Sequence, residues 1–526
     1  MNNFVEDLTL KYYFDNVEKL PLSLGIERRD FGAYYTDQHI VNYILDNLSI
    51  NEESYILDPS CGCGSFLFPL YLRSLIGTSG NLSQIYGVDI DKKAIDFTVN
   101  ILSKLSGHHD KDILLNHLIN DDFIFESKKF KEESAPFTNV LASGGFHFII
   151  GNPPFNITIK KRKLPTLENK IHIDIAQKSK YIPIYFILRA LELLRNDGTL
   201  AFVLPKTLLY VGKYNEFRTY LLENFTIQKI VEIGIKFKDV RGEQIILFIK
   251  NKKPVANDSL EFSTISNKPP YRSENAFKVM RGYFTSRKVL PTMPNKESYQ
   301  IINELSENHQ RMIEASEINV FRGVSLGKSI INRIPYNRNS KIPSNAFIRG
   351  KSISKLSLKE LVTVDDSQVS RSKILELCKP KIVTQNIYSS ESGLISYLDM
   401  QGIPTTETVS NIIIDDLGKL AYVFALLNSK LMNFYLSQFV FSGSKLTMHV
   451  DKYYLLQLPL IWYPDKEETL ELIKLVNGTD GSKTKNYKTQ LKKIDELVYK
   501  LYKITDEQRK EIETIMNRTL SKKSIW

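Results

Sequence analysis

A rigid corner that is rich in hydrogen-bond acceptors follows the apolar run HFIIG, and it consists of Asn152, Pro153, Pro154 and Phe155. Two consecutive prolines fix two φ angles and remove two backbone donors, so carbonyl oxygens outnumber N–H groups here. The Asn152 side-chain oxygen and the Pro153 carbonyl are two acceptors that suit both hydrogens of an exocyclic amine. The Phe155 ring offers a face on which a base can stack, an interaction worth ~1–3 kcal/mol.

Accepting both N–H bonds would also activate such an amine. An amine attached to an aromatic base is a poor nucleophile because its lone pair is delocalised into the ring. Two acceptors at Asn152 and Pro153 draw the nitrogen toward tetrahedral geometry and localise that lone pair. The corner therefore indicates chemistry at an amine. The alternative is a proline-rich turn with Asn152 as its cap, and these four residues alone leave both interpretations open.

A glycine-containing turn, DPSCGCGSF, runs from Asp58 to Phe66 after a short apolar segment. Gly62 and Gly64 permit a tight turn and let backbone N–H groups come close to a ligand. The simple alternative is a close connection between a strand and a helix. A phosphate-loop lysine is missing, and so is the full three-glycine dinucleotide fingerprint, so neither an NTP nor NAD is favoured.

Acidic residues follow the next two apolar segments. Asp89, in YGVDID, stands where a carboxylate accepts hydrogen bonds from both ribose hydroxyls of a bound nucleoside. The nearby Asp91 suits a helix N-cap instead. NDDF, from Asn120 to Phe123, supplies an acid for an adenine amino group, although alone it resembles a surface turn.

The cysteines and histidines do not predict a metal site. Cys61 and Cys63 form a C-x-C pair without a partner cluster, and the eight histidines are scattered. HHD at 108–110 is interpreted as a solvated loop. We expect no metal.

The elements that position these residues alternate between short apolar runs and amphipathic stretches of helical spacing. This pattern predicts an α/β fold, a Rossmann-like, doubly wound and mostly parallel sheet, with ligands at the carboxyl ends of its strands. The expected strands are 55–58, 84–90, 147–152, 199–204, 227–233 and 244–250.

The pattern changes after KNKKPVANDS at 250–259, where proline, serine and asparagine become frequent. We therefore expect a catalytic domain over 1–255, a mixed α+β target-recognition domain over 256–462 and a helical segment over 463–526. The stretch 321–355 is rich in Lys and Arg and has no acid, which suits contacts to phosphates. In the tail, TDEQ at 505–508 predicts a helix capping box.

The composition is that of a globular protein with a modest basic surplus. The 526 residues include 70 Lys+Arg and 59 Asp+Glu, a net charge of +11, which favours a nucleic-acid partner only weakly. Three cysteines indicate a reducing compartment. The first residues lack the pattern of a signal peptide, and no apolar run is long enough to span a bilayer. We expect a soluble cytoplasmic protein without a membrane partner.

Taken in order, DPSCGCGSF, YGVDID, NDDF and GNPPF resemble the motifs of the gamma-class (TaqI-like) N6-adenine DNA methyltransferases of restriction-modification systems. DFGAYYTDQHIV at 30–41 is similar to the N-terminal motif of this family, with Asp37 where proline is usual. FALLNSKLMNFYLSQF, QLPLIWYP and IDELVYKLYKITDEQ resemble its C-terminal half. Four ordered motifs at strand ends are more specific than any one of them.

The resemblance implies roles for individual residues. Thr36, Asp58, Gly62, Asp89, Asp122 and Phe123 would bind S-adenosyl-L-methionine, Asp89 at the ribose and Asp122 at the adenine amine. The catalytic corner of Asn152, Pro153, Pro154 and Phe155 would hold the target adenine, and Phe237 would stack on the other face of the flipped base. Lys206 matches no role.

The implied activity is transfer of a methyl group to N6 of a flipped-out adenine in double-stranded DNA, with a cognate restriction endonuclease as a possible second partner at the same site. One alternative is an S-adenosylmethionine-dependent methyltransferase that acts on an RNA base or a protein glutamine amide. Another is a non-catalytic DNA-binding specificity subunit. The long C-terminal half disfavours the first, and the intact motif residues disfavour the second.

Overall fold

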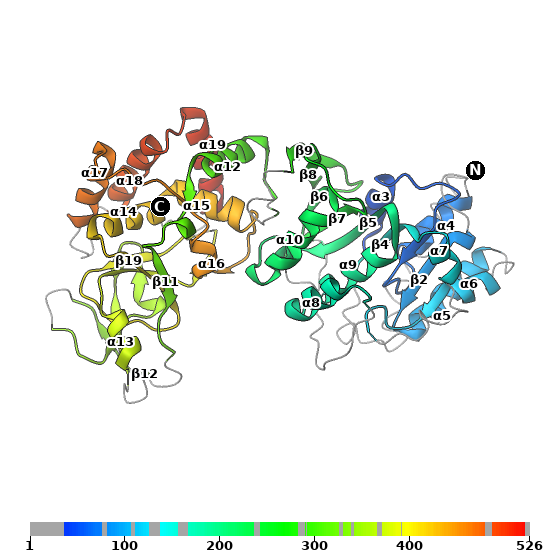
Figure 1. The fold of residues 1–526 in the computed structure, drawn as a ribbon, viewed down its shortest axis with the longest axis horizontal. Coiled ribbons are helices and arrows are strands. Elements are labelled where there is room, and N and C mark those ends of the chain that lie inside the picture. The colour runs from blue at the N-terminus through cyan, green and yellow to red at the C-terminus, as the bar shows by residue number, and fades with distance from the viewer. Residues whose placement is uncertain are drawn as a thin grey trace. The chain divides into compact units, whose positions relative to one another are not determined.

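The computed structural model describes residues 36–75, 82–106, 111–125, 137–155, 167–235, 242–281, 290, 292–325, 330–337, 341–364, 371–390, 392–478 and 487–520. The chain divides into two compact units, Met1–Leu290 and Pro291–Trp526 (Figure 1).

A nine-stranded sheet forms the centre of the described part of the first unit, in the order β3-β2-β1-β4-β5-β7-β6-β8-β9. Five of its eight neighbouring strand pairs are parallel, and the three antiparallel pairs involve β7 or β9. The prediction of a doubly wound, mostly parallel sheet is confirmed. The strands are β1 Ile56–Asp58, β2 Ile85–Asp89, β3 Leu118–Asn120, β4 Phe146–Gly151, β5 Leu194–Pro205, β6 Thr226–Gly234, β7 Gln244–Lys250, β8 Ser259–Ile265 and β9 Ser273–Met280.

The direction of the strands gathers their carboxyl ends at one edge. The strands β1 to β5 are mutually parallel through their neighbours, and β6 has the same direction as β5 because both run antiparallel to β7. Residues that follow β1, β2, β3, β4, β5 and β6 therefore emerge at the same edge of the sheet. This is the edge at which open α/β sheets bind ligands.

Helices bury both faces of this sheet. One core joins residues of α3, α4 and α5 to alternate strand residues such as Ile56, Ala201 and Val203. The intervening residues, among them Leu200 and Phe202, are equally buried, and α9 packs against β5. Figure 1 shows α8, α9 and α10 together beside the sheet. The helices are α3 Gln38–Asp46, α4 Leu67–Leu75, α5 Lys92–Leu105, α6 Lys111–His117, α7 Thr138–Ala142, α8 Lys170–Ser179, α9 Ile182–Leu193 and α10 Asn215–Asn224.

The sheet continues past the domain boundary expected at 255/256. The strand β8 pairs in parallel with β6, and β9 pairs with β8, so both belong to the first unit. The compact units divide about 35 residues later, after Leu290. The Pro- and Asn-containing segment at 250–259 is thus a connection between two strands of one sheet.

The second unit combines small sheets with a group of helices. Its sheets have the orders β11-β20-β17-β19 and β12-β16-β13, together with short two-stranded pairs. The strands are β10 Gln310–Arg311, β11 Asn319–Arg322, β12 Ile330–Pro335, β13 Ala346–Phe347, β14 Ile353–Ser354, β15 Ser357–Leu358, β16 Glu360–Val364, β17 Lys381–Gln385, β18 Ile387–Tyr388, β19 Ser396–Asp399, β20 Val409–Ile413, β21 Met448–His449 and β22 Pro459–Leu460.

The helices of the second unit come from both ends of its sequence. The helix α19 packs on α12 and α15, while α17 and α18 pack on α14. The described helices of the expected C-terminal segment 463–526 therefore pack on other helices of this unit. Among the described residues, none of the helices has the length and apolar content that crossing a bilayer requires. The helices are α12 Lys296–Asn308, α13 Arg371–Leu377, α14 Leu417–Asn428, α15 Lys430–Tyr435, α16 Lys452–Leu455, α17 Glu467–Asn477, α18 Tyr487–Leu501 and α19 Asp506–Leu520.

The capping box predicted at 505–508 begins α19. The Gln508 N–H donates to Thr505 Oγ1 at 3.2 Å, and the Thr505 N–H donates to Gln508 Oε1 at 3.1 Å. Replacing Thr505 with Ala removes one of these caps and is expected to cost about 1 kcal/mol, which is roughly fivefold faster exchange of the first-turn amide hydrogens. Hydrogen exchange read by mass spectrometry measures it.

The matched control for this change is Thr514→Ala. Thr514 lies within α19, and its hydroxyl donates to the Lys510 carbonyl oxygen at 2.7 Å, so alanine there improves helix propensity and removes no cap. Equal exchange rates in the two variants would contradict the capping role of Thr505.

Candidate active site

The turn after β1 is anchored by buried hydrogen bonds. Asp58 is 1% exposed, and its Oδ1 accepts the Ser60 N–H at 3.0 Å. The Cys61 N–H donates to the Val88 carbonyl oxygen at 3.0 Å, which ties the turn to β2. Gly62 and Gly64 have φ of 51° and 86°, a left-handed conformation that glycine adopts without steric cost. Burial raises the pKa of the Asp58 carboxyl well above its usual range, against the opposing effect of the Ser60 N–H.

Asp89 links the end of β2 to the same turn. Its Oδ2 accepts the Gly62 N–H at 2.8 Å, and its Oδ1 accepts the Asp91 N–H at 2.9 Å. Burial raises the pKa of Asp89, and the two backbone N–H groups oppose this shift. The Asp91 carboxylate accepts the Lys93 N–H at 2.9 Å, so the prediction that Asp91 caps α5 is confirmed. Asp89 is therefore the acid that faces the glycine turn.

The segment after β3 packs beside Asp89. The Asn120 side-chain amide donates to the carbonyl oxygens of Asp89 and Ile90, at 3.0 and 2.9 Å. Asp122 Oδ1 accepts the N–H groups of Ile124 and Phe125, both at 3.1 Å, so this oxygen holds the local turn. Phe123 is buried and stacks on Phe186 with ring centroids 5.4 Å apart.

The acceptor corner follows β4 at the same edge. The Asn152 side-chain Nδ2 donates to the Thr36 hydroxyl at 3.2 Å. The Asn152 Oδ1 is buried, and within the described part of the chain it has no hydrogen-bond partner. A buried polar atom without a partner is costly, and such atoms are rare in native structures. The Asn152 oxygen is thus an oriented acceptor that no donor of the described residues reaches.

Gly151 brings this corner into contact with the glycine turn. A Cβ atom at Gly151 would lie 2.7 Å from Asp58 Oδ1, a separation too short for any side chain there unless Asp58 moves. The Asp58 carboxyl group and the Pro59 ring come so close to the Gly151 backbone that they leave no room for a Cβ atom. Asp58 and Gly151 are therefore in direct contact, although 93 positions (151 − 58) separate them in the sequence.

Pro153 is buried and Pro154 is half-buried, while the aromatic residue of the corner lies deeper than expected for a stacking platform. Phe155 is 6% exposed and belongs to the core cluster of α3, α4, α5 and the sheet. Phe237, expected on the other side of the base, lies outside the described residues. Direct contacts join Gly62 to Asp89, Asn152 to Thr36 and Gly151 to Asp58 at this edge, and Asp122 and Phe123 follow β3 there. The roles assigned to these residues stay predictions.

A buried ion pair at this edge had no assigned role in the sequence. Lys206 follows β5 and is 1% exposed, and its Nζ lies 2.8 Å from Glu232 Oε1 in β6. The feature of the sequence that could have indicated this pair is a lysine directly after the apolar run 199–204 and Pro205. Among the described residues, no group of three His, Cys, Asp or Glu could hold a metal ion.

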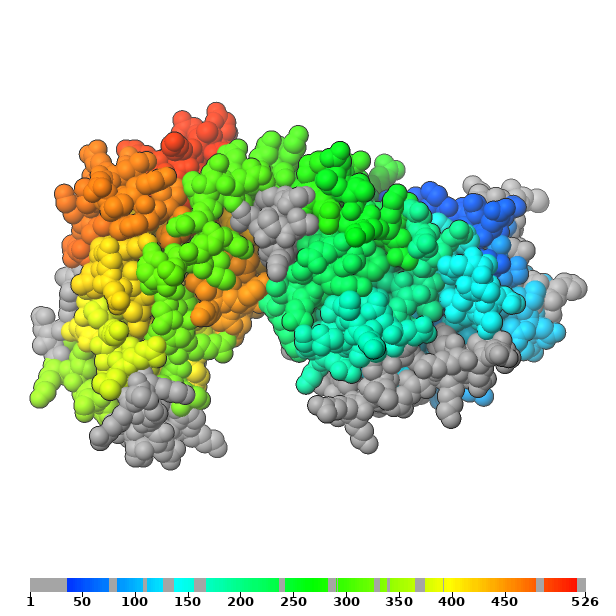
Figure 2. All heavy atoms as spheres, viewed as in Figure 1, coloured from blue at the N-terminus to red at the C-terminus, as the bar shows by residue number. Residues whose placement is uncertain are grey.

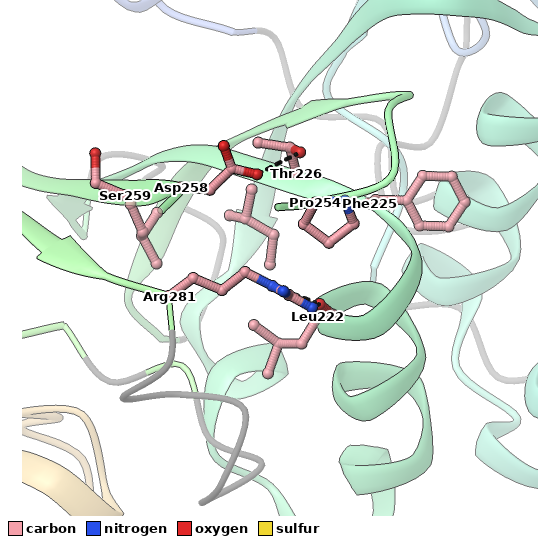
Figure 3. A pocket seen from close by; sticks show the side chains of 9 residues that line it. Leu222, Phe225, Thr226, Pro254, Asp258, Ser259 and Arg281 are labelled. Atoms are coloured by element: carbon pink, nitrogen blue, oxygen red, sulfur yellow. Dashed lines mark hydrogen bonds between the residues drawn. The ribbon is translucent and has the colours of Figure 1, made fainter. Parts of the chain in front are cut away.

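A small pocket lies at the opposite edge of the sheet, at the amino ends of β6 and β8 (Figure 3). Arg281 Nε and Nη2 donate to the Leu222 carbonyl oxygen at 3.2 and 2.8 Å, so this arginine caps the end of α10. The Thr226 hydroxyl donates to Asp258 Oδ2 at 3.3 Å. These groups hold the strand ends together and lie apart from the strand-end acids, so we assign the pocket no part in the active site.

Comparison with protein-family models identifies both units. Residues 83–238 match the Eco57I restriction-modification methylase, a range that contains Asp89, Asp122 and Asn152. Residues 345–460 match the TaqI-like C-terminal specificity domain. The chain therefore carries an Eco57I-like restriction-modification methylase domain followed by a TaqI-like specificity domain. The resemblance inferred from the motifs is confirmed.

Individual relatives agree with this assignment. The Type II methyltransferase M.HincII of Haemophilus influenzae is 25% identical over 279 residues, which are 50% of this chain and 46% of that protein. The restriction enzyme and methyltransferase RM.Eco57I of Escherichia coli is 27% identical over 322 residues, 49% of this chain and 32% of that protein. The chain thus spans at most about half the length of these relatives. The Type IIL restriction-modification enzyme MmeI in complex with DNA has a similar fold, with a TM-score of 0.52 and 12% identity over 99% of this chain and 78% of that one.

Proposed function

We propose that this protein is a site-specific DNA methyltransferase that transfers a methyl group from S-adenosyl-L-methionine to N6 of adenine in double-stranded DNA. The observation that carries the proposal is the buried Asn152 Oδ1 without a donor, at the edge where Asp58 and Asp89 also lie. The methylase and specificity domains support it, as do the restriction-modification relatives.

The described residues fit the proposed cofactor. Gly62 supplies a side-chain-free backbone above Asp89, whose carboxylate is held by two N–H groups in a fixed orientation for ribose hydroxyls. Asp58 supports the turn, Asp122 is oriented for the adenine amine, and Phe123 supplies the apolar wall. Thr36 lies next to Asn152 and closes the site from the N-terminal side. When bound, S-adenosylmethionine provides a methyl group on a sulfonium, which is a good leaving group.

The acceptor corner holds the amine. Asn152 Oδ1 and the Pro153 carbonyl oxygen accept its two N–H bonds, which orients the nitrogen and localises its lone pair. The fixed proline backbone keeps these acceptors in register, so positioning contributes much of the rate. We assign no general base. The target base must leave the DNA stack, at a cost of a few kcal/mol. We propose that stacking on Phe155 and Phe237 offsets part of this cost, which requires the Phe155 ring to move out of the core that buries it.

The second unit is assigned to DNA recognition. Its basic stretch 321–355 meets phosphates, so affinity falls as salt rises. We assign the first unit, Met1–Leu290, to catalysis, since β8 and β9 complete its sheet, and the second unit, Pro291–Trp526, to target recognition. The second proposed partner is a cognate restriction endonuclease that acts at the same DNA site. The relative RM.Eco57I is described as both a restriction enzyme and a methyltransferase, which supports this proposal.

One experiment tests the proposal. The protein is expressed in a host without DNA methylation, and modified bases are mapped by single-molecule sequencing. Adenine modified at N6 within one short motif is the expected result. Modification at N4 of cytosine would be consistent with the role proposed for the acceptor corner, but it would overturn the proposal that the target base is adenine. Unmodified DNA from cells that contain folded protein would overturn the proposal in favour of an RNA or protein amide substrate.

A further inference from the structure

The surface of the second unit carries a cluster made from three short segments. Arg322 ends β11, His449 ends β21, and Ile387 begins β18. The segments near residues 320 and 450 are far apart in sequence, yet they lie side by side (Figure 2). Ile387 and His449 are directly opposite each other in the antiparallel pair β18–β21, so their side chains share one face. We call Arg322, His449 and Ile387 the donor patch.

The guanidinium of Arg322 is held in a defined orientation. Its Nη2 donates to His449 Nδ1 at 3.1 Å and to Asp451 Oδ2 at 3.3 Å. The other Asp451 oxygen accepts the Tyr453 N–H at 3.0 Å as the N-cap of α16. One carboxylate thus joins the arginine to a helix terminus, and this limits the rotation of the Arg322 side chain.

The backbone beneath the patch is also fixed. Asn386 is 2% exposed; its Oδ1 accepts the Ser410 hydroxyl at 2.7 Å, and its carbonyl oxygen accepts the Val450 N–H at 2.8 Å. Ser410 is the β20 partner of Arg322. The hydrogen bonds therefore connect β11, β20, β18 and β21 around the patch. A site on such connected strands is more precise than one on a loose loop.

The patch presents hydrogen-bond donors and one apolar side chain. Arginine only donates, so His449 Nδ1 accepts and the proton of the neutral ring is on Nε2. Burial and the neighbouring Arg322 charge lower the pKa of His449, which favours the neutral ring at pH 7. The side chain of Arg322 is 48% exposed, and in the described part of the chain its only bonds use Nη2. Ile387 is 58% exposed.

Only one base matches a purely donating edge in the major groove. Guanine presents N7 and O6, both acceptors, whereas adenine and cytosine each present an amino donor that would face the donors of the patch. Thymine has a single acceptor and a methyl group. We propose that Arg322, oriented by His449 and Asp451, recognises a guanine in the DNA target. This inference rests on the proposed function.

The exposed isoleucine argues for a base rather than a phosphate. Phosphate oxygens gain nothing from an apolar neighbour, while a base edge offers carbon atoms and methyl groups on which Ile387 can pack. A phosphate contact that only neutralises charge does not require the orientation that His449 and Asp451 impose on Arg322, because it carries no sequence information. The restrained guanidinium and the adjacent apolar side chain together fit the groove edge of a base pair.

The test compares the modified motif of the wild type with that of Arg322→Lys. Lysine keeps the charge and loses the planar fork, so a phosphate contact survives and bidentate recognition of guanine does not. We expect the wild-type motif to contain an invariant G·C pair, and the variant to accept other pairs at that position alone. In binding assays with matched oligonucleotides, the preference for that pair is expected to fall by about 10- to 150-fold.

Arg509→Lys is the matched control. Arg509 lies on α19, has a 37% exposed side chain and is paired with Glu513 at 3.1 Å, so its replacement is expected to leave the motif unchanged. Arg322 lies in the second unit, so an unchanged thermal unfolding transition of the whole protein, and not cofactor binding to the first unit, shows that Arg322→Lys is folded.

Two results would overturn the inference and leave the proposed function intact. One is a wild-type motif without a G·C pair. The other is a uniform loss of methylation in Arg322→Lys with every motif position unchanged, which would identify a phosphate contact. Unmodified DNA from the wild type would instead remove the proposed function, and the inference with it.

Discussion

Replacing Asn152 with alanine is expected to lower the rate of DNA methylation by about 10²- to 10³-fold, the scale on which enzymes lose rate when one preorganised hydrogen-bonding group is removed from the reacting centre. The Asn152 Oδ1 is buried and is already oriented by the bond from Nδ2 to Thr36. A water molecule in the alanine variant would therefore be a poorer acceptor, because it would first have to be ordered. Without this acceptor the target amine keeps its lone pair in the ring. Single-turnover methylation of a DNA duplex that contains the mapped motif measures the effect.

The same variant is expected to bind the cofactor as the wild type does, since the glycine turn and Asp89 are unchanged. Isothermal titration with S-adenosylmethionine checks this. Asn224→Ala is the matched control: Asn224 is exposed on α10, where its amide donates to the Tyr220 carbonyl oxygen at 2.9 Å. Methylation at a near-normal rate by Asn152→Ala would refute the assignment of the acceptor corner.

Replacing Asp89 with alanine is expected to weaken cofactor binding by about 10- to 150-fold. This factor corresponds to the loss of one hydrogen bond to a charged group in a buried site. The variant loses the carboxylate that we assign to the ribose, and it also frees the N–H groups of Gly62 and Asp91. Asp89→Asn retains the shape and one acceptor, so we expect a smaller loss. Titration calorimetry gives both dissociation constants.

Asp91→Ala is the control that distinguishes a loss of cofactor binding in Asp89→Ala from a loss of stability. Asp91 is two residues away from Asp89, is also acidic and caps α5. Its replacement is expected to cost about 1 kcal/mol of helix stability and to leave the affinity for the cofactor unchanged. An Asp89→Ala protein with unchanged affinity, or an Asp91→Ala protein with equally reduced affinity, would rule out the ribose role of Asp89.

The sequence predicted most of the strands that carry the site. All six expected strands exist; Asp58 and Asp89 end two of them and Asn152 follows a third, because the apolar runs end there. The strand β3 was not predicted as a strand, since Leu118–Asn120 is too short to show periodicity. The extension by β8 and β9 was missed because parallel pairing with β6 is non-local, whereas the Pro- and Asn-containing connection before it resembles an interdomain linker.

Contacts within the site required the structure. The bond between Asn152 and Thr36 joins residues 116 positions apart, and Asp89 reaches Gly62 across 27. Such contacts depend on how strands stack side by side, which periodicity does not encode. The Lys206–Glu232 pair is of the same kind, because Lys206 directly follows β5 and Glu232 lies on β6, with β7 between these two strands in the sheet.

The close approach of Gly151 to Asp58 limits how this protein can be re-engineered. Any side chain at 151 collides with a buried carboxylate that also holds the Ser60 N–H in the glycine turn, so a change at the corner after β4 disturbs the turn after β1 as well. A larger residue at position 151 is therefore compatible with this backbone only if Asp58 is changed with it, so the turn after β1 and the corner after β4 have to be redesigned together.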